Sequence, residues 1–388
     1  MSVHRVVVAG GGIGGLTLAR ALTARGLSVR VLEQAPGPSE VGAGITLWRN
    51  ALNVLESLDL GDAVEAVAHA PESGGIGLPD GRMLSVVHLE DIPGAIRRPL
   101  LLTFHRRDLQ RVLLDALPEG TVEFGCRVVG YREMPNAVAC EIEGRREIEA
   151  DLLVGADGIS SRVRAQLLGQ EPPRYAGYTC FRGVTYAAPA ARHTSGEFWG
   201  AGDRFGVVPI AGDRMYWFAV ISAPPRQQVD DAKAYLLRRF ERYAAHLPDL
   251  IERTAADAIV HNDIIDRPPI SGWSGSRVTL LGDAVHATTP NLGQGAAMAI
   301  ESAAILARAL SKPTGLADAL SRYEAARQRR TTHVTRTSWR VGRMAHIRSA
   351  PGRAIRNLAL RVTPPAVPLR SLVGLLGYDA STAELGER

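Results

Sequence analysis

The sequence predicts an α/β fold in which a Rossmann-like domain is interwoven with a mainly antiparallel β-sheet domain and followed by C-terminal helices. Three features lead to this prediction. A glycine-rich turn near the N-terminus joins an apolar strand to a helix. In the middle of the chain, apolar and polar residues alternate in short runs as they do in β-strands, and the last part is largely helical. We expect residues 1–72, 100–172 and 269–315 in the first domain, residues 73–99 and 173–268 in the second, and residues 316–388 in the helical region.

The first strand and helix frame a nucleotide-binding motif. Residues 6–9 form a short apolar run, as expected of a strand that is buried on both faces of a parallel sheet. The turn that follows fits the pattern G-x-G-x-x-G on Gly10, Gly12 and Gly15, and residues 16–22 have the composition of a helix. Glycine permits this tight turn and lets the backbone approach a pyrophosphate, which then lies at the positive N-terminus of the helix.

The second strand completes the motif. It spans residues 29–32 and ends on Glu33, where an acid accepts hydrogen bonds from the ribose of an adenosine. A glycine-rich turn alone would be weak support. The strand before it, the helix after it and the acid beyond it together predict a dinucleotide site rather than a simple tight turn.

Length and composition favour an ordinary globular protein. The 388 residues suffice for two domains, and the hydrophobic content of 46% is typical of such proteins. No apolar run approaches the roughly 18 residues needed to cross a membrane. The first strand begins too close to Met1 for a signal peptide, so we expect a cytoplasmic protein without a membrane span.

Cysteine usage argues against both a disulfide framework and a zinc site. Cys126, Cys140 and Cys180 are odd in number, far apart and in no C-x-x-C pair. We therefore expect no metal.

The net charge of +5 is concentrated near the C-terminus. Residues 325–378 contain eleven Arg and no Asp or Glu, which leaves 34 basic and 40 acidic residues in the rest of the chain. A basic segment can bind a membrane surface or a polyanion. These arginines alternate with apolar residues such as Trp339, Met344 and Leu358, however, and we expect helices that pack on a core and expose solvated outer faces. Nucleic acid is not an expected partner.

The other elements follow in chain order. Before the second domain we expect a loop at residues 34–40, a helix at 51–55, hairpin strands within 73–99, an amphipathic helix opening at 104–110, short strands within 122–148 and a strand at 150–154. Aromatic residues make up only 5% of the chain, and several gather between residues 175 and 223, as in antiparallel strands. The remaining elements are strands at 178–184, 204–209 and 215–220, a helix at 229–247, a buried strand at 277–281 and a long helix at 296–310.

Two later strands also lead into acids beside glycine. Gly155-Ala156-Asp157-Gly158 follows one strand, and Gly282-Asp283-Ala284-x-His286 follows another. An acid at such a place can cap the next helix. Capping is therefore one open role for Asp157 and Asp283.

These three strand-to-loop elements, in this order, resemble the FAD-dependent aromatic hydroxylases, the single-component flavoprotein monooxygenases of the p-hydroxybenzoate hydroxylase fold. Urate hydroxylase-like and 3-hydroxybenzoate hydroxylase-like proteins are among the relatives. The resemblance covers the chain to about residue 350. It extends to Gly42-Ala43-Gly44-Ile45, His105-Arg106-x-Asp108-Leu109 and Pro290-Asn291-Leu292-Gly293-Gln294-Gly295.

The resemblance implies FAD as the cofactor. Gly14, Glu33 and Arg106 would hold its ADP half, with Val128 near the adenine. Asp283 would bind the ribityl chain. The helix start after Gly293 would place N–H groups at the flavin N1/C2 carbonyl, where reduced flavin carries negative charge. The residues expected at FAD are Gly10, Gly12, Gly14, Gly15, Glu33, Gln34, Thr46, Arg106, Val128, Asp157, Asp283, Gly293, Gln294, Gly295, Ala296 and Ala297.

The resemblance also implies NADH or NADPH as the reductant and O2 as the oxidant. The chain has one dinucleotide fingerprint, so the nicotinamide cofactor would dock transiently without a Rossmann domain of its own. Oxygen would add to the reduced flavin as a C4a-hydroperoxide, which an electron-rich aromatic carbon attacks. The site must exclude water for this chemistry to succeed.

Four residues are candidates for contact with the substrate or the reacting oxygen. Pro290 would lie beside the oxygen, although proline also suits a helix start. Arg204 and Tyr216 resemble the arginine and tyrosine of FAD-dependent urate hydroxylase, and a structural role is their alternative. His286 is either a base for a phenol proton or a tether between loops.

The leading hypothesis is an FAD-dependent, NAD(P)H-driven monooxygenase that hydroxylates a small aromatic or heteroaromatic compound. Within this class, a urate or purine hydroxylase and an epoxidase are alternatives. Outside it, an oxygen-independent flavin dehydrogenase or reductase is the main competitor. A halogenase is disfavoured because no W-x-W-x-I-P element is found, and the oligomeric state is left as monomer or homodimer.

Overall fold

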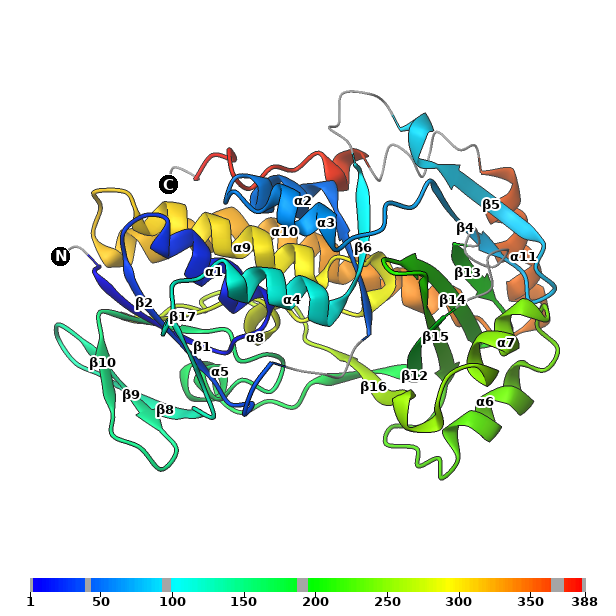
Figure 1. Ribbon diagram of the computed structural model, residues 1–388, viewed down its shortest axis with the longest axis horizontal. Helices are drawn as coiled ribbons and strands as arrows, with labels where there is room; N and C mark the ends of the chain where they lie inside the picture. The colour runs from blue at the N-terminus through cyan, green and yellow to red at the C-terminus, as the bar shows by residue number, and fades with distance from the viewer. Residues whose placement is uncertain (1–2, 39–42, 93–98, 187–194, 364–372, 386–388) are drawn as a thin grey trace.

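The computed structural model describes residues 3–38, 43–92, 99–186, 195–363 and 373–385. Gly42 and the last part of the expected hairpin segment, residues 93–98, lie outside this part of the chain. Within it, two large sheets lie at opposite ends of the molecule and long helices run between them (Figure 1). The α/β architecture predicted from the sequence is confirmed.

The first sheet is parallel and has five strands. In spatial order they are β17 (Val278–Leu280), β11 (Leu152–Gly155), β1 (Arg5–Ala9), β2 (Ser28–Glu33) and β7 (Val122–Phe124). In the register, Val8 pairs with Val154 on one side and with Val31 on the other. Because parallel strands end at one edge, the loops after β1, β11 and β17 meet there, although they come from distant parts of the sequence.

Helices cover this sheet. The main ones are α1 (Ile13–Thr23), α2 (Arg49–Glu56), α9 (Gly295–Leu310) and α10 (Leu316–Ala345), and α9 packs against the other three. Gly14 permits the approach of α1 to α9, because a Cβ there would lie 2.8 Å from Leu281 Cδ2 and 3.0 Å from Ala299 Cβ. The shorter helices are α3 (Gly61–Ala66), α4 (Arg106–Asp115), α5 (Arg162–Leu168) and α8 (Asp283–His286).

The second sheet has seven strands, and only β13 and β4 pair in parallel within the described part of the chain. In spatial order they are β16 (Val260–Asp266), β12 (Arg174–Tyr186), β15 (Arg214–Ser222), β14 (Asp203–Ile210), β13 (Gly196–Trp199), β4 (Ser73–Gly77) and β5 (Met83–His88). Phe181, Phe205 and Trp217 face a core formed with the helices α6 (Ala232–Phe240) and α7 (His246–Glu252). Since side chains alternate along a strand, Arg182, Arg204 and Tyr216 face the opposite side.

Smaller elements join or flank these sheets. The β3 (Gly44–Trp48) and β6 (Leu101–His105) ribbon stands between the two sheets in Figure 1. Beside the first sheet, β8 (Val128–Glu133), β9 (Val138–Ile142) and β10 (Ile148–Ala150) form an antiparallel sheet. The chain also has the 3-10 helices η1 (Leu89–Asp91), η3 (Ala256–Ala258) and η4 (Pro290–Leu292), and the helix α11 (Ala350–Val362). No helix among the described residues is long and apolar enough to cross a membrane.

Two helix predictions need correction. The helix expected from residue 104 begins only at Arg106, because Phe104 is a buried β6 residue that pairs with Ile45. The single helix expected at residues 229–247 is two helices, α6 and α7. Pro248 explains the break: in one continuous helix its missing N–H would fall in the interior, whereas here it lies in the first turn of α7.

The basic C-terminal helices agree with the expectation only in part. In α10, Val334 and Ala345 are buried against the rest of the protein. Met344 and Leu358 are 37% and 61% exposed, so the expectation that the apolar residues of this segment pack inward is wrong for them. The reason for Leu358 is the orientation of α11, whose buried residue is Arg356.

Candidate active site

The turn after β1 requires glycine at two positions, because a side chain at either would clash with the backbone. Gly10 has a φ of +108°, and a Cβ there would lie 2.4 Å from the carbonyl oxygen of Ala156. A Cβ at Gly15 would lie 2.0 Å from the carbonyl oxygen of Gly10. Gly12 differs, because it precedes α1 with no side-chain cap and a Cβ there would meet nothing within 4 Å. Open space thus lies beside the uncapped N–H groups of α1, as a pyrophosphate requires.

The carboxylate of Glu33 holds this turn in place. Its Oε2 accepts a hydrogen bond from the Gly11 N–H at 2.6 Å, and its Oε1 accepts one from the Ala35 N–H at 2.8 Å. An open pocket beside it is lined by Glu33, Gln34, Ala35, Gly125, Arg127 and Glu143. Val128 is buried in β8 and does not line this pocket, whereas its neighbour Arg127 does. The sequence reasoning missed Arg127, although a cation one residue from the expected adenine contact could have been considered.

Asp157 caps α5. Its Oδ1 accepts a hydrogen bond from Ser161 Oγ at 2.5 Å, and its Oδ2 accepts one from the Arg162 N–H at 2.7 Å. Burial raises the pKa of this carboxyl group, and these hydrogen bonds oppose the rise. The helix-capping role left open by the sequence therefore describes the contacts of Asp157, and a role at FAD stays a prediction.

Asp283 has an accessible carboxylate without a partner. It begins α8, directly after Gly282 at a φ of +65°, and its carboxylate accepts no hydrogen bond from the residues that the structure describes. The side chain is accessible to solvent, while burial raises its pKa against the effect of Arg106. Arg106 opens α4, and its backbone N–H donates to the Ala43 carbonyl at 2.9 Å.

Buried polar atoms without partners gather around the start of α9. Gln294 precedes this helix, and its Oε1 accepts a hydrogen bond from Asn50 Nδ2 at 3.0 Å. Its Nε2, Trp48 Nε1 and Thr288 Oγ1 are buried and have no hydrogen-bond partner among the described residues. Gly293 adopts the left-handed conformation, and a Cβ there would lie 3.3 Å from Trp48 Nε1. Buried polar groups normally have partners, so these atoms indicate a site for a polar ligand.

The rest of this helix start consists of small residues. Gly295 begins α9 without a side-chain cap, and Ala296 and Ala297 follow as its next two residues. Pro290 is exposed and begins η4, so the helix-start alternative describes its place in the chain. Thr46 is half-buried in β3.

Tyr216 connects the second sheet to the loops of the first. Its ring lies directly against Gly44, where a Cβ would be 2.3 Å from Tyr216 Cγ. The side chain is half-accessible, and no described residue forms a hydrogen bond with its hydroxyl group. Burial and the neighbouring Cys180 raise the pKa of Tyr216, while Arg182 opposes this rise. The phenol is therefore neutral and free to bind a ligand.

Arg204 is buried and already paired. Its Nη1 donates to Glu197 Oε2 at 2.8 Å, and its Nη2 donates to Asn291 Oδ1. Asn291 Nδ2 in turn donates to the Tyr178 hydroxyl and to the Ser338 carbonyl, both at 2.9 Å. Only the Nε of Arg204 lacks a partner in the described structure. Arg204 thus ties the second sheet to η4.

Arg182 is the cation that the sequence reasoning missed. It is half-accessible on the face of the sheet that carries Tyr216, and its Nε lies 3.4 Å from Cys180 Sγ. No carboxylate of the described chain forms an ion pair with it. Cys180 raises the pKa of Arg182 more than burial lowers it, so the guanidinium stays charged. The period-two alternation of β12 could have identified it, because Arg182 shares a face with Cys180 and Val184.

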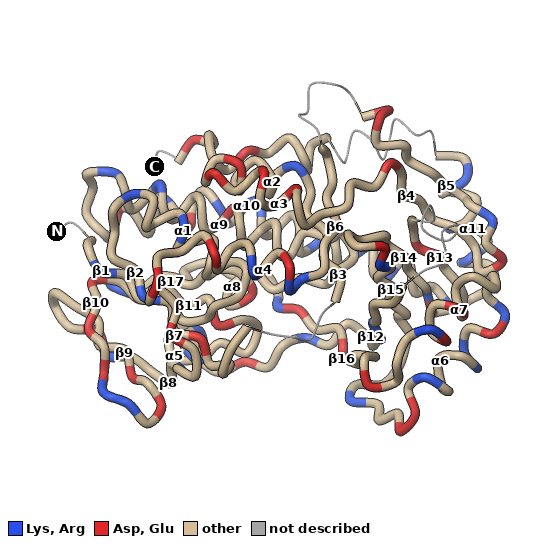
Figure 2. The backbone as a smooth tube through the Cα atoms, viewed as in Figure 1, with Lys and Arg blue, Asp and Glu red and all other residues tan. Residues whose placement is uncertain are grey.

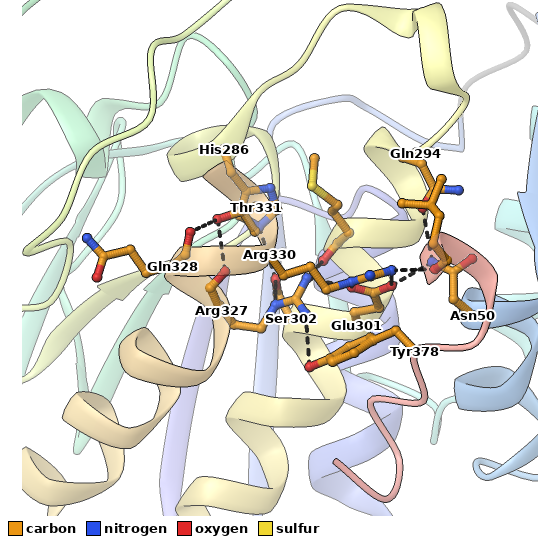
Figure 3. A network of polar contacts seen from close by, with 12 residues as sticks. Asn50, His286, Gln294, Glu301, Ser302, Arg327, Gln328, Arg330, Thr331 and Tyr378 are labelled. Atoms are coloured by element: carbon orange, nitrogen blue, oxygen red, sulfur yellow. Dashed lines mark hydrogen bonds and ion pairs between the residues drawn. The ribbon is translucent and has the colours of Figure 1, made fainter. Parts of the chain in front are cut away.

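His286 is held in a buried polar network (Figure 3). Its Nε2 lies 3.0 Å from Ser302 Oγ, which also accepts a hydrogen bond from Arg327 Nε at 3.0 Å. Burial and the positive charge of Arg327 lower the pKa of His286 to about 3. The histidine is neutral, and its contacts correspond to the tethering alternative.

Glu301 is the centre of this network. It is fully buried and accepts hydrogen bonds from Arg327 Nη2 at 2.7 Å, from Arg330 Nη2 at 2.6 Å and from Asn50 Nδ2 at 2.5 Å. Burial alone would raise the pKa of Glu301, but the two arginines and the amide together hold it below its ordinary value. Since Asn50 also binds Gln294, the network supports the start of α9 from behind (Figure 3).

The sequence matches the family described as FAD binding domain over residues 4–338. It is 41% identical over 360 residues to aurachin C monooxygenase/isomerase of Stigmatella aurantiaca, covering 92% of this chain and 94% of that protein. It is 34% identical over 394 residues to 3-amino-4-hydroxybenzoate 2-monooxygenase of Streptomyces cremeus, covering 99% and 98%. The chain belongs to the FAD-dependent aromatic hydroxylases.

A solved member of this family has the same architecture. HpxO of Klebsiella pneumoniae, in complex with FAD and uric acid, matches with a TM-score of 0.89 at 28% identity, covering 96% of each chain. The protein is thus an oxygen-using flavin monooxygenase. Its residues fit FAD: the open space beside Gly12, the accessible Asp283 and the unpartnered polar atoms near Gln294 belong to the loops after β1 and β17, which meet at one edge of the parallel sheet.

Gly12 offers a selective test of the phosphate position. We expect Gly12→Ala to leave the stability of the FAD-free protein within about 1 kcal/mol of wild type, because the new methyl group meets no protein atom. FAD should bind at least about tenfold more weakly, because the methyl group takes the space of the pyrophosphate. Isothermal titration of the FAD-free protein with FAD measures this effect.

Gly315→Ala is the matched control. Gly315 precedes α10 in an extended conformation, and a Cβ there also meets nothing within 4 Å. Its FAD affinity should equal that of wild type. Equal FAD affinity of Gly12→Ala and wild type would place the pyrophosphate elsewhere.

Proposed function

We propose that this hydroxylase uses NADH or NADPH and O2 to insert one oxygen atom into a small aromatic or heteroaromatic substrate. The substrate would lie between the FAD loops and the Tyr216 face of the seven-stranded sheet. The observation that carries this proposal is the contact of the Tyr216 ring with Gly44, which brings that face directly onto the loops expected to hold the flavin. We retain the cytoplasm as the proposed location.

The proposed site residues have distinct tasks. The N-terminus of α1 and Glu33 would hold the ADP half of FAD, and Asp283 would accept hydrogen bonds from the ribityl hydroxyls. The uncapped N-terminus of α9 would stabilise negative charge on the flavin ring. Bound FAD would supply the redox chemistry, taking a hydride from the nicotinamide and delivering one oxygen atom of O2 to the substrate. Pro290 would border the reacting centre and help to exclude water.

Arg182 and Tyr216 would orient the substrate. An accessible guanidinium without a carboxylate partner favours a substrate with an anionic or enolic oxygen, and a neutral phenol can donate a hydrogen bond to it. The names of two relatives support this choice, since a 3-amino-4-hydroxybenzoate and uric acid both carry acidic oxygens. For Arg204 and His286 we propose positioning roles, because Arg204 Nη1 already binds Glu197 and His286 Nε2 already lies at Ser302 Oγ.

Arg182→Gln should raise the KM for the substrate by about tenfold or more, the loss expected for one charge-assisted hydrogen bond. FAD content should not change, because Arg182 lies on β12 of the seven-stranded sheet and not on the loops proposed to hold FAD. Steady-state kinetics at saturating NAD(P)H, together with the flavin absorbance of the purified variant, measure both effects.

Arg214→Gln is the control, because Arg214 lies on the neighbouring strand but pairs with Asp108 at 2.7 Å. It should leave the substrate KM unchanged. An unchanged KM in Arg182→Gln would remove Arg182 from the pocket.

Substrate-stimulated oxidation of NAD(P)H tests the proposed function as a whole. A panel of phenols, hydroxybenzoates and purines should contain compounds that stimulate both NAD(P)H and O2 consumption, with stoichiometric hydroxylated product. Urate is the second candidate substrate, because HpxO was solved with uric acid. An epoxide product would select the epoxidase alternative, and turnover that continues without O2 would identify a dehydrogenase.

A further inference from the structure

Helix α11 presents apolar side chains to solvent. Ile355, Leu358 and Val362 are 70%, 61% and 64% exposed. Their spacing of three and four residues places them on one face of the helix. Single exposed apolar residues are ordinary, but a continuous row on one helix marks an interaction surface.

Contacts on the inner side of α11 fix this orientation. Arg356 is buried, and its Nη1 donates to the Ala345 carbonyl at 3.0 Å. Its guanidinium carbon lies 5.4 Å from the centroid of the Trp199 ring. The helix therefore directs an arginine inward and aliphatic side chains outward, which is the reverse of a helix that packs on a globular core.

The chain segment that carries this face is basic. Residues 343–363 contain five Arg and no Asp or Glu. Arg343 and Arg361 are exposed, and neither forms an ion pair within the described chain. β5 lies beside α11 and adds the partly exposed Met83 and Val86. Figure 2 shows both basic and acidic residues along this edge of the molecule.

We propose that α11 docks the protein on an anionic lipid bilayer. Ile355, Leu358 and Val362 would enter the boundary between headgroups and acyl chains, and the nearby arginines would lie at the lipid phosphates. Stable association at a membrane surface needs both an apolar face and positive charge, and α11 offers the two together. This inference does not depend on the proposed chemistry.

A second copy of the chain fits this face less well. The 13 residues of α11 span about 20 Å, and three aliphatic side chains fall short of the roughly 800 Å² that each partner buries in a standard interface. Two copies would also bring arginines against arginines, which opposes association.

The docking helix also lies against the sheet that we propose to hold the substrate. Trp199, which Arg356 contacts, donates from Nε1 to Glu197 Oε2 at 2.8 Å. The same carboxylate oxygen accepts the hydrogen bond from Arg204. A membrane-bound α11 would therefore hold this sheet close to the lipid surface.

Vesicle co-sedimentation tests the proposal. The purified protein should pellet with vesicles of phosphatidylcholine and phosphatidylglycerol in equal parts and stay in solution with vesicles of phosphatidylcholine alone, and added salt should weaken the binding. The triple variant Ile355→Asn, Leu358→Asn and Val362→Asn should bind the anionic vesicles at least about tenfold more weakly, because its apolar face is lost. The double variant Arg343→Gln and Arg361→Gln should also bind them more weakly.

Val129→Asn is the matched control, because Val129 is 42% exposed on β8, at the end of the molecule away from α11 in Figure 1. It should bind vesicles like the wild type. The proposal is overturned if the wild type does not pellet, or if the triple variant pellets equally well. A dimer that the triple variant abolishes, without vesicle binding by the wild type, would assign the face to a second copy. A lower melting temperature of the triple variant with unchanged vesicle binding would show that the face is covered from within the chain.

Discussion

Asp283→Ala should lose most of its bound FAD. The carboxylate is accessible at the start of α8 and accepts no hydrogen bond from any described residue, so its acceptor capacity is free for the ribityl hydroxyls. Hydrogen bonds to a charged group are worth about 1.5–3 kcal/mol, so the FAD affinity should fall by roughly tenfold to more than a hundredfold. The ratio of flavin to protein absorbance after desalting measures the loss.

Asp62→Ala is the control for Asp283→Ala. Asp62 also lies in the first turn of a short helix, α3, but is exposed on the outside of the protein. Its variant should keep its flavin. Full flavin occupancy of Asp283→Ala would show that the ribityl chain binds elsewhere.

The pH dependence of FAD binding should follow the same carboxyl group. Burial raises the pKa of Asp283 in the FAD-free protein, with Arg106 opposing. Its ionised form therefore costs stability above that pKa, and the cost disappears as the pH falls and the group is protonated. Protonation of Asp283 also removes an acceptor for the ribityl hydroxyls, so FAD affinity should decrease on acidification. Over the same pH range, Asp283 should stop destabilising the FAD-free protein. An affinity in Asp283→Asn that varies with pH as in wild type would assign the effect to another group.

The glycine turns and the parallel sheet were predictable because their constraints are local. Gly10 and Gly15 are required by backbone contacts within the turn and with the loop after β11, and such a requirement is visible in the spacing of the glycines. The predicted roles of individual residues at FAD are still predictions.

The pairing state of a charged side chain was not predictable. Arg204 and Arg182 both lie on strands with aromatic neighbours, and the sequence favoured Arg204 as the substrate contact. Only the fold brings Asn291 to Arg204 and leaves Arg182 without a carboxylate. Asn291 is 87 residues away from Arg204 in sequence, so no local pattern could reveal this contact.

The orientation of α11 escaped sequence reasoning for a related reason. The alternation of arginine and aliphatic residues correctly indicated a helix with two different sides. Periodicity does not say which side faces the protein. That is decided by the Ala345 carbonyl and the Trp199 ring, which come from other elements and receive Arg356.

Glu301→Gln should cause the largest loss of stability. The substitution leaves the buried Arg327 and the largely buried Arg330 without their counter-charge. Removing one partner of a buried ion pair costs about 3–5 kcal/mol. Thermal unfolding of the FAD-free protein measures the loss, and Asp115→Asn is the control, because its ion pair with Arg111 is exposed and worth at most about 1 kcal/mol.

The stability difference between wild type and Glu301→Gln should depend on pH. Because the pKa of Glu301 is held below its ordinary value, its contribution to stability is present above the unfolded carboxyl pKa of about 4.3 and is lost as the pH falls through the folded value. The stabilities of wild type and Glu301→Gln should therefore converge in acid. A constant difference down to low pH would mean that the network acts through packing rather than through charge.

A triple variant separates stability from function. Replacing Glu301, Arg327 and Arg330 together with methionine removes the whole set of buried charges, and such replacements are often neutral or stabilising. Asn50 would then lose its bond to Glu301, and Gln294 at the start of α9 would lose the support behind it. We expect the triple variant to recover most of the stability that Glu301→Gln loses and still to bind FAD weakly. If FAD affinity recovers together with stability, the network serves the fold alone.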